Sequence, residues 1–217
     1  MNENRRIYVD LDDVLCETAR AFTLLLETHF HKTVAFDDMA SFDLGQSFDL
    51  NPEQVARFMD LAHTPNVLRA FEPVAGAINA LNRFIVLGYE IAVITGRPPS
   101  TASVTREWLH DHCIPYHNLT FVNKYARAGW HGSAPGVITL DELAASSFCF
   151  AVEDSGEMAA FLAAKMGLPV ALLDRPWNRE LPPSDAQALA LIDRCPDWTA
   201  IADKFGAGGQ TTTGGTR

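Results

Sequence analysis

The stretch that decides the fold is Ile7-Tyr8-Val9-Asp10-Leu11-Asp12-Asp13-Val14-Leu15, near the start of the chain. Apolar residues lead into three carboxylates within four positions, and apolar residues resume behind them. A half-buried strand would alternate apolar with polar residues, and a fully buried strand would carry no acid. We therefore expect a buried strand that ends at its acids. In open parallel sheets, ligands bind just beyond the carboxyl ends of the strands.

Asp10 and Asp12 lie two positions apart, so their side chains point to the same side of an extended chain. Two like charges this close repel each other, and a bound divalent cation is the usual remedy. The stretch therefore predicts a metal-assisted carboxylate site.

Further apolar runs that end in polar residues read as buried strands: 91–94, 119–122, 148–152 and 169–173. Helical signals lie between the strands, namely apolar residues at three- and four-residue steps in 17–30, an Asn-Pro start at 51–52, a capping box at 139–142 and a closing glycine at 167. Strands that alternate with helices indicate an α/β fold, with a parallel sheet of about five strands and helices on both faces.

The segment 17–72, between the first two strands, is longer than one crossover helix needs. We interpret it as a small helical cap inserted over the strand ends, which leaves residues 1–16 and 73–205 as the core. Residues 32–50 show no sustained period and read mostly as loop. Residues 206–217 are rich in Gly and Thr, and we expect a disordered tail.

The 217 residues carry a formal net charge of -10, which argues against a nucleic-acid polymer or an anionic membrane surface as the main partner. A small phosphorylated metabolite remains compatible, because a local cation can reverse the field inside one pocket. Four separated cysteines favour a reducing compartment. With no signal-peptide pattern and no apolar run of about 18–20 residues, we expect a cytoplasmic protein. The sequence does not indicate the oligomeric state.

The strand ends carry residues suited to phosphoryl transfer from a monoester. Asp10 can attack phosphorus as a carboxylate nucleophile and form an aspartyl-phosphate. Asp12 can protonate the leaving alkoxide and then activate the hydrolytic water. Asp154, with Asp10 and a backbone carbonyl near Asp12, can hold Mg²⁺, which requires oxygen ligands.

The remaining candidates would bind the phosphoryl group. Thr95 offers a hydroxyl together with nearby backbone amides such as that of Gly96, and Lys124 offers a positive charge. Arg97 precedes a proline in an expected exposed turn, where it could reach the phosphate or a cap carboxylate. Glu153 could contact the metal through water or serve as a structural partner, and Trp177 could be a core residue or a stacking platform.

The set Asp10-Leu11-Asp12, Thr95, Lys124 and Glu153-Asp154 resembles the motifs of the haloacid dehalogenase superfamily. The resemblance implies a Rossmann-like core, Mg²⁺ and a cap between the first two motifs. An acid two residues after the nucleophile is what the phosphatase branches carry, so Asp12 disfavours a carbon–halogen hydrolase.

A narrower resemblance is to the 5'(3')-deoxyribonucleotidase family and its bacterial relatives. It lies in the stretches 71–77, 94–98, 152–155 and 174–178. That family has a small helical cap whose aromatics stack on the base, and by position Phe42 would be such a residue. The chain departs from the pattern at Asp43, where an aromatic would be expected, and in the long stretch 125–147 before the acidic pair.

The sequence thus predicts a Mg²⁺-dependent phosphatase, with nucleoside 5'-monophosphates as the preferred substrate. A phosphatase for another small metabolite, such as a sugar phosphate or phosphoglycolate, is the alternative within the same chemistry. A non-catalytic nucleotide-binding or regulatory protein on the same scaffold is the alternative from a different class. Retention of the whole reactive set counts against that last reading.

Overall fold

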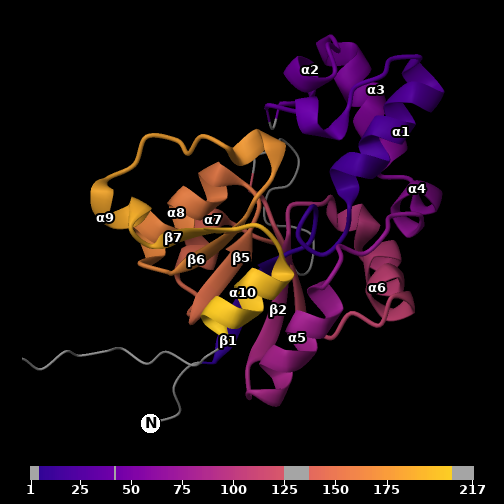
Figure 1. Ribbon diagram of the computed structural model, residues 1–217. Coiled ribbons are helices and arrows are strands. Elements are labelled where there is room, and N and C mark those ends of the chain that lie inside the picture. Colours follow the sequence, from indigo (N-terminus) through magenta and orange to yellow (C-terminus); the bar gives the residue numbers. More distant parts are fainter. Residues whose placement is uncertain (1–4, 42, 125–136, 207–217) are drawn as a thin grey trace, which may run out of the picture.

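The computed structural model describes residues 5–41, 43–124 and 137–206. Its seven strands form one parallel sheet in the order β4-β3-β2-β1-β5-β6-β7 (Figure 1). The strands are β1 (Arg6–Asp10), β2 (Glu90–Thr95), β3 (Asn118–Val122), β4 (Val137–Ile138), β5 (Phe150–Glu153), β6 (Val170–Leu173) and β7 (Ile192–Cys195). The α/β fold with a parallel, Rossmann-like sheet is confirmed.

The sheet has seven strands where the sequence predicted about five. The two additional strands lie at the edges of the sheet. β4 has two residues, which is too short to give a period. β7 carries Asp193 and Arg194 in its middle, so it lacks the continuous apolar run of a buried strand.

β1 lies in the middle of the sheet, between β2 and β5. Asp10 is opposite Ile94 of β2, and Val9 is opposite Val152 of β5. Thr95 is in turn opposite Phe121 of β3. This register places the carboxyl ends of four strands, β1, β2, β3 and β5, side by side at one edge of the sheet.

Two hydrophobic clusters cover the two faces of the sheet, and alternate residues of β1 enter each. Ile7 and Val9 pack with α5 (Ala77–Val86), α6 (Ala102–Asp111) and α10 (Trp198–Phe205). Tyr8 packs on the other face with α7 (Leu140–Ala144), α8 (Gly156–Met166) and α9 (Ala186–Leu189). Because residues two apart share a face of a strand, Asp10 is on the same side as Tyr8.

The helices between β1 and α5 project beyond the carboxyl ends of the strands (Figure 1). They are α1 (Thr18–Phe30), the 3₁₀ turn η1 (Phe36–Asp38), α2 (Leu44–Ser47), α3 (Pro52–Ala62) and α4 (Pro65–Arg69). Eight buried residues between Ala19 and Ala62 form a hydrophobic cluster separate from those of the sheet. This separate core supports our division of the chain into a cap, 17–72, and a core, 1–16 and 73–205, which stays a prediction.

The two segments that connect these helices to the sheet run side by side. Cys16 and Pro73 form an antiparallel bridge, and the Glu17 N–H donates to the Glu72 carbonyl at 2.8 Å. Residues 32–50, expected as mostly loop, contain the short elements η1 and α2, and α4 was also not predicted. These elements have three to five residues each, so they are too short to show a helical period in the sequence.

Several local signals act as the sequence predicted. Asn51 and Gln54 form a capping box at the start of α3, and Thr139 and Glu142 form another at α7. Gly167 ends α8 in the left-handed conformation, with φ 61°.

Two further 3₁₀ turns, η2 (Pro99–Thr101) and η3 (Pro176–Asn178), follow β2 and β6. Among the described residues, no helix is long and apolar enough to cross a membrane. The expected tail, 206–217, lies outside them apart from Gly206.

Candidate active site

Three acids meet at the carboxyl edge of the sheet. Asp10 ends β1, Glu153 ends β5 and Asp154 follows it, and one carboxylate oxygen from each lies within 4.8 Å of the others. All three residues are buried. The structure therefore brings Asp10 and Asp154 together from opposite halves of the chain, as the motifs predicted.

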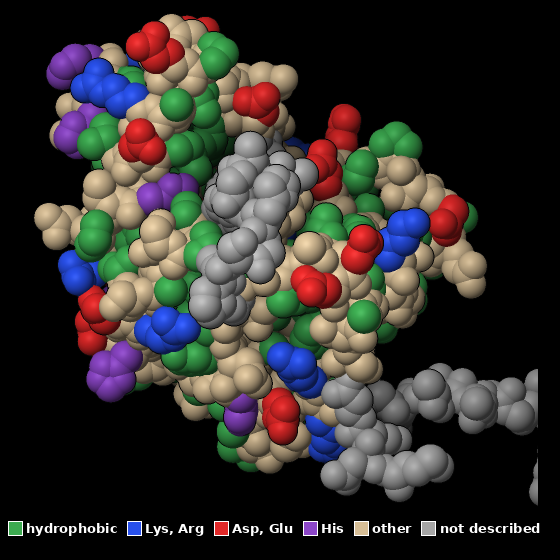
Figure 2. All heavy atoms as spheres, turned by 180° about the vertical axis from the view of Figure 1, so that it is seen from behind, with side chains coloured by type: hydrophobic (Ala, Val, Ile, Leu, Met, Phe, Trp, Pro, Cys, Tyr) green, Lys and Arg blue, Asp and Glu red, His purple; other side chains and the backbone are tan. Residues whose placement is uncertain are grey.

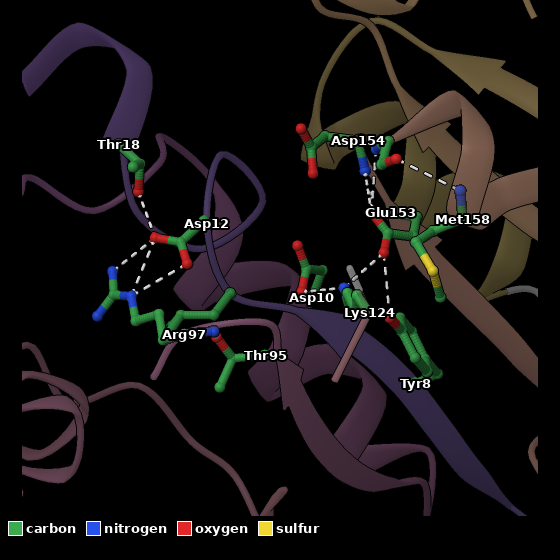
Figure 3. Close-up of polar contacts among 12 residues, drawn as sticks. Tyr8, Asp10, Asp12, Thr18, Thr95, Arg97, Lys124, Glu153, Asp154 and Met158 are labelled. Carbon is green, nitrogen blue, oxygen red and sulfur yellow. Dashed lines mark hydrogen bonds and ion pairs between the residues drawn. The ribbon is translucent and has the colours of Figure 1, made fainter. Parts of the chain in front are cut away.

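Lys124 lies between two of these acids. Its Nζ donates to Asp10 Oδ1 at 2.7 Å and to Glu153 Oε1 at 2.8 Å, and its side chain is only 2% exposed (Figure 3). The lysine is positioned by the end of β3, which is the neighbour of β2 in the sheet. The long stretch that follows Lys124 in sequence does not prevent this lysine from reaching the site.

Negative charge exceeds positive charge in this cluster. Burial, followed by the charge of Glu153, raises the pKa of Asp10 to about 8, although Lys124 acts in the opposite direction. Burial and the charges of Glu153 and Asp10 raise the pKa of Asp154 well above its usual value. A divalent cation would relieve this repulsion, and carboxylate oxygens are the ligands that Mg²⁺ prefers.

Asp10 and Asp154 each have an oxygen that could bind such an ion. Lys124 donates to Asp10 Oδ1, and the Trp177 indole N–H donates to Asp154 Oδ2 at 2.9 Å. Within the part of the chain that the structure describes, no hydrogen bond is made to Asp10 Oδ2 or Asp154 Oδ1. The acid cluster therefore fits a metal ion, and these two oxygens are its candidate ligands.

Trp177 and Asn178 fix the position of Asp154, a role that the sequence did not reveal. Besides the indole contact, Asn178 Nδ2 donates to the Asp154 carbonyl at 2.7 Å and to the Leu173 carbonyl at 2.8 Å. Trp177 is partly exposed and its ring contacts Phe36 of the cap, with centroids 5.7 Å apart. The only sequence signal was the stretch 174–178 after β6, which pointed to the family and not to this role.

Asp12 is not part of the acid cluster, although its sequence position suggested a shared ligand. Its carboxylate accepts three hydrogen bonds from Arg97, at 2.7, 3.0 and 3.1 Å, and one from Thr18 Oγ1 at 2.6 Å (Figure 3). Burial opposes ionisation of Asp12, but the charge and hydrogen bonds of Arg97 outweigh burial and lower its pKa. A metal contact through the Asp12 backbone carbonyl stays a prediction.

The expectation that Arg97 lies in an exposed turn is wrong. The residue is 3% exposed, and its guanidinium also contacts Cys16 Sγ at 3.2 Å and lies over the Phe71 ring, 5.4 Å from the centroid. The carboxylate of Asp12 compensates the buried charge, which the local sequence could not show because Asp12 lies 85 positions away. A phosphate contact by Arg97 stays a prediction.

Thr95 and Gly96 lie at the end of β2. Thr95 is fully buried, and its Oγ1 accepts the backbone N–H of Arg97 at 3.1 Å, so the hydroxyl stabilises the turn. Gly96 lines the cavity described below. Phosphate binding by the two residues stays a prediction.

Asp13, to which the sequence gave no role, fixes the loop between β1 and the cap. It adopts a left-handed conformation with φ 57°, and its Oδ1 accepts the Ala19 N–H in the first turn of α1 at 2.9 Å. Arg175 donates to its backbone carbonyl at 2.7 and 3.0 Å. These contacts tie the start of the cap to the loops that carry the acids.

A cavity of about 510 Å³ lies between the strand ends and the cap. At the strand ends it is lined by Asp10, Asp12, Asp13, Gly96, Arg97, Lys124 and Asp154, and at the cap mainly by apolar side chains, namely Phe22, Met39, Leu44, Val55, Met59, Ala62, Leu68 and Phe71. Ser41 and His63 add polar groups to the cap side. Phe42, the predicted base-stacking residue, lies outside the described residues.

Two sequence comparisons relate the chain to nucleotidases. The sequence profile of a family described as 5' nucleotidase, deoxy (pyrimidine), cytosolic type C protein matches residues 4–129. A protein of Halalkalibacterium halodurans named "Putative nucleotidase BH1399" is 22% identical over 199 residues, which cover 92% of this chain and 91% of that protein.

Solved structures share the fold at low sequence identity. A haloacid dehalogenase family hydrolase from Deinococcus radiodurans, solved with bound phosphate and sodium, is 14% identical with a TM-score of 0.60, over 94% of this chain and 95% of that one. A hydrolase of the same superfamily from Geobacter sulfurreducens is 16% identical with a TM-score of 0.54, over 93% and 96% of the two chains.

Proposed function

The chain belongs to the deoxy (pyrimidine), cytosolic type C family of 5'-nucleotidases, and from that premise we propose that it is a Mg²⁺-dependent phosphomonoester hydrolase acting on nucleoside 5'-monophosphates. Phosphatase activity follows from the family and from the haloacid dehalogenase fold. The metal, the covalent mechanism and the nucleotide substrate are the parts we propose.

In the first half of the proposed reaction, Asp10 is the nucleophile. A carboxylate oxygen of Asp10 forms a bond to phosphorus while the bond from phosphorus to the ester oxygen breaks. Asp12, ionised in the free enzyme because Arg97 lowers its pKa, has to take up a proton in the substrate complex and then donates it to that leaving oxygen, so the nucleoside departs as an alcohol. The products of this half are an aspartyl-phosphate at Asp10 and an ionised Asp12.

In the second half, Asp12 takes a proton from water, whose oxygen attacks phosphorus and releases inorganic phosphate from Asp10. The contacts of Asp12 support this role, because its two oxygens differ. Oδ1 accepts hydrogen bonds from Thr18 Oγ1, from Cys16 Sγ and twice from Arg97, whereas Oδ2 accepts one, from Arg97 Nε. Oδ2 of this partly exposed carboxylate is therefore the atom we assign to proton transfer.

The cation would be held by Asp10 and Asp154. When bound, Mg²⁺ supplies positive charge that neutralises the phosphate oxygens and the acid cluster. Lys124 holds Asp10 Oδ1 and adds a second positive charge beside the phosphoryl group. Positioning and charge neutralisation are most of what phosphoryl transfer requires.

The cap side of the cavity supports a nucleoside leaving group. A volume of about 510 Å³ accommodates a small phosphorylated metabolite. Apolar and aromatic side chains on the cap suit the faces of a base better than the hydroxyls of a sugar.

On the face seen in Figure 2, basic and acidic side chains are interspersed among the described residues, with no continuous basic patch for a nucleic-acid polymer. The proposed location is the cytoplasm.

One observation carries the proposal: Lys124 bridges Asp10 to Glu153 beneath a cavity that Asp10, Asp12 and Asp154 also line. Phosphate release from a panel of nucleoside monophosphates, sugar phosphates and phosphoglycolate, with Mg²⁺ or with chelator, tests it. We expect Mg²⁺-dependent release, fastest from the nucleotides. Faster release from a sugar phosphate or phosphoglycolate would support the alternative substrate class. Nucleotide binding without release would support a non-catalytic protein.

A further inference from the structure

Glu153 lies within the acid cluster, yet its contacts differ from those of Asp10 and Asp154. We propose that Glu153 is not a metal ligand, and that Glu153 and Tyr8 together form a buried clamp that positions Lys124 against the nucleophile. The inference rests on the proposed function, since it concerns how the same site is held. It assigns a positioning role to Tyr8, a residue that does not line the cavity.

Each carboxylate oxygen of Glu153 already accepts two hydrogen bonds. Oε2 accepts the backbone N–H groups of Asp154 and Ser155, at 2.8 and 3.0 Å. Oε1 accepts Lys124 Nζ at 2.8 Å and the Tyr8 hydroxyl at 3.0 Å (Figure 3). A carboxylate has about four lone-pair sites, so these four donors saturate it.

Burial separates Glu153 from the cavity. Its exposure is 0%, and it is absent from the described cavity lining, which includes Asp10, Asp154 and Lys124. To bind an ion, Glu153 would have to give up a charged donor or a buried backbone N–H. Losing such a partner leaves a buried polar group unsatisfied, which is costly. Asp10 Oδ2 and Asp154 Oδ1, which accept no hydrogen bond from the described residues, would bind an ion without that loss.

Tyr8 reaches this cluster because of its place on β1. It lies two residues before Asp10, so both side chains project from the same face of the strand. The fully buried ring packs edge-on against Phe148, with centroids 5.8 Å apart. Lys124 Nζ lies over the same ring, 5.5 Å from its centroid. The Tyr8 ring therefore contacts the Lys124 ammonium directly, and the Tyr8 hydroxyl acts on Lys124 through Glu153.

The clamp holds the Lys124 ammonium against Asp10, the proposed nucleophile. An ammonium group has three donors on a flexible stem, so a single acceptor would not define its position. Glu153 is held by two backbone N–H groups and by Tyr8, and it provides a rigid second acceptor opposite Asp10. Residues that orient such groups from outside the cavity typically change activity by about 10–100-fold when removed.

Tyr8→Phe tests the clamp, because it removes the hydroxyl and keeps the ring. We expect kcat to fall about tenfold, with an unchanged KM because Tyr8 does not touch the cavity. Affinity for Mg²⁺, measured by calorimetry on the substrate-free protein, should also stay unchanged. The matched control is Tyr89→Phe, which removes a phenol hydroxyl from a ring packed on Phe84 and Phe150, away from the acids.

A kcat of Tyr8→Phe equal to that of Tyr89→Phe, in an active wild-type enzyme, would overturn the clamp. An inactive wild-type protein would instead contradict the proposed function. Mg²⁺ calorimetry does not depend on turnover: Glu153→Gln should bind Mg²⁺ like wild type, whereas Asp154→Asn should bind it at least tenfold more weakly. Equal losses in both variants would make Glu153 a ligand and overturn the inference. If Glu153→Gln does not fold, the Tyr8→Phe comparison decides alone.

Discussion

Arg97, which is buried, and Asp12, which is partly exposed, form an ion pair in which three hydrogen bonds, at 2.7–3.1 Å, join the guanidinium to the carboxylate. The arginine lies just after β2 and the acid just after β1. Both residues therefore belong to the core segments, close to the Cys16–Pro73 bridge at which the chain passes from the core to the cap. Arg97 orients the carboxylate that we assign to proton transfer.

Arg97→Lys should lower kcat by about 10–100-fold with little change in KM. An ammonium cannot reproduce the planar, two-sided contact of a guanidinium, so Asp12 would lose its orientation. The loss should not exceed the roughly 10²–10⁴-fold that a general acid–base contributes. Steady-state kinetics measure both constants, and the surface variant Arg69→Lys, which alters the exposed Arg69–Glu107 pair, is the control.

The same variant separates the two roles considered for Arg97. If the guanidinium binds substrate phosphate, KM should rise instead. Asp12→Ala, and the double variant with Arg97→Lys, complete a cycle. If Arg97 acts through Asp12, the double variant should be no slower than Asp12→Ala alone. Additive losses would contradict a positioning role.

Trp177→Phe should raise the Mg²⁺ concentration for half-maximal activity by about tenfold. The substitution keeps a ring beside Phe36 but removes the N–H that holds Asp154 Oδ2. A Mg²⁺ titration at saturating substrate measures the effect. Trp198→Phe is the control, because it removes an indole N–H that donates to the Val14 carbonyl and to none of the three clustered acids. An unchanged Mg²⁺ requirement would show that the indole does not position this ligand.

The metal-free protein should lose stability as pH rises from about 5 to 8. The pKa of Asp10 is raised from 3.8 to about 8 on folding, chiefly by burial and then by the charge of Glu153. Between these two values the folded state holds a proton that the unfolded state has released, so the stability contributed by Asp10 falls with pH. Asp154 acts in the same direction, and the lowered pKa of Asp12 acts only in more acidic solution.

Thermal unfolding in chelator across this pH range measures the loss. Asp10→Asn should make the pH dependence shallower, with a remainder from Asp154 and Asp13, whose pKa values are also raised. Mg²⁺ should raise the Tm of wild type most at pH 8, where the acids favour the ionised form that binds it. Parallel pH profiles of wild type and Asp10→Asn, with no effect of Mg²⁺, would contradict the charge balance described for the site.

Met59→Ala tests the cap side of the cavity. Met59 lines it from α3 and is partly exposed, so its loss should weaken contact with a base by on the order of 1 kcal/mol, which is about a fivefold rise in KM for a nucleotide. KM for phosphoglycolate, which has no base, should not change. Leu24→Ala, on the exposed side of α1, is the control. An equal rise for both substrates would argue against base recognition at this wall.

The sequence predicted those parts of the site that lie directly at strand ends. Asp10, Lys124 and Asp154 end or follow buried apolar runs, and parallel strands bring such ends to one edge. Arg97 was misjudged because its environment depends on a partner 85 positions away. Tyr8 and Trp177 were missed as positioning residues for a similar reason: on their own they are ordinary aromatics, and only the packed fold places their polar atoms on Glu153 and Asp154.

The central claim is that Asp10 carries the phosphoryl group. Acid quenching during turnover, followed by borohydride reduction and peptide mass spectrometry, tests it directly, because reduction converts an aspartyl-phosphate to homoserine. We expect homoserine at position 10 in the wild-type enzyme with substrate and Mg²⁺, and none without substrate. Asp10→Asn should release no phosphate. Unmodified Asp10 during turnover, together with phosphate release by Asp10→Asn near the wild-type rate, would contradict the account.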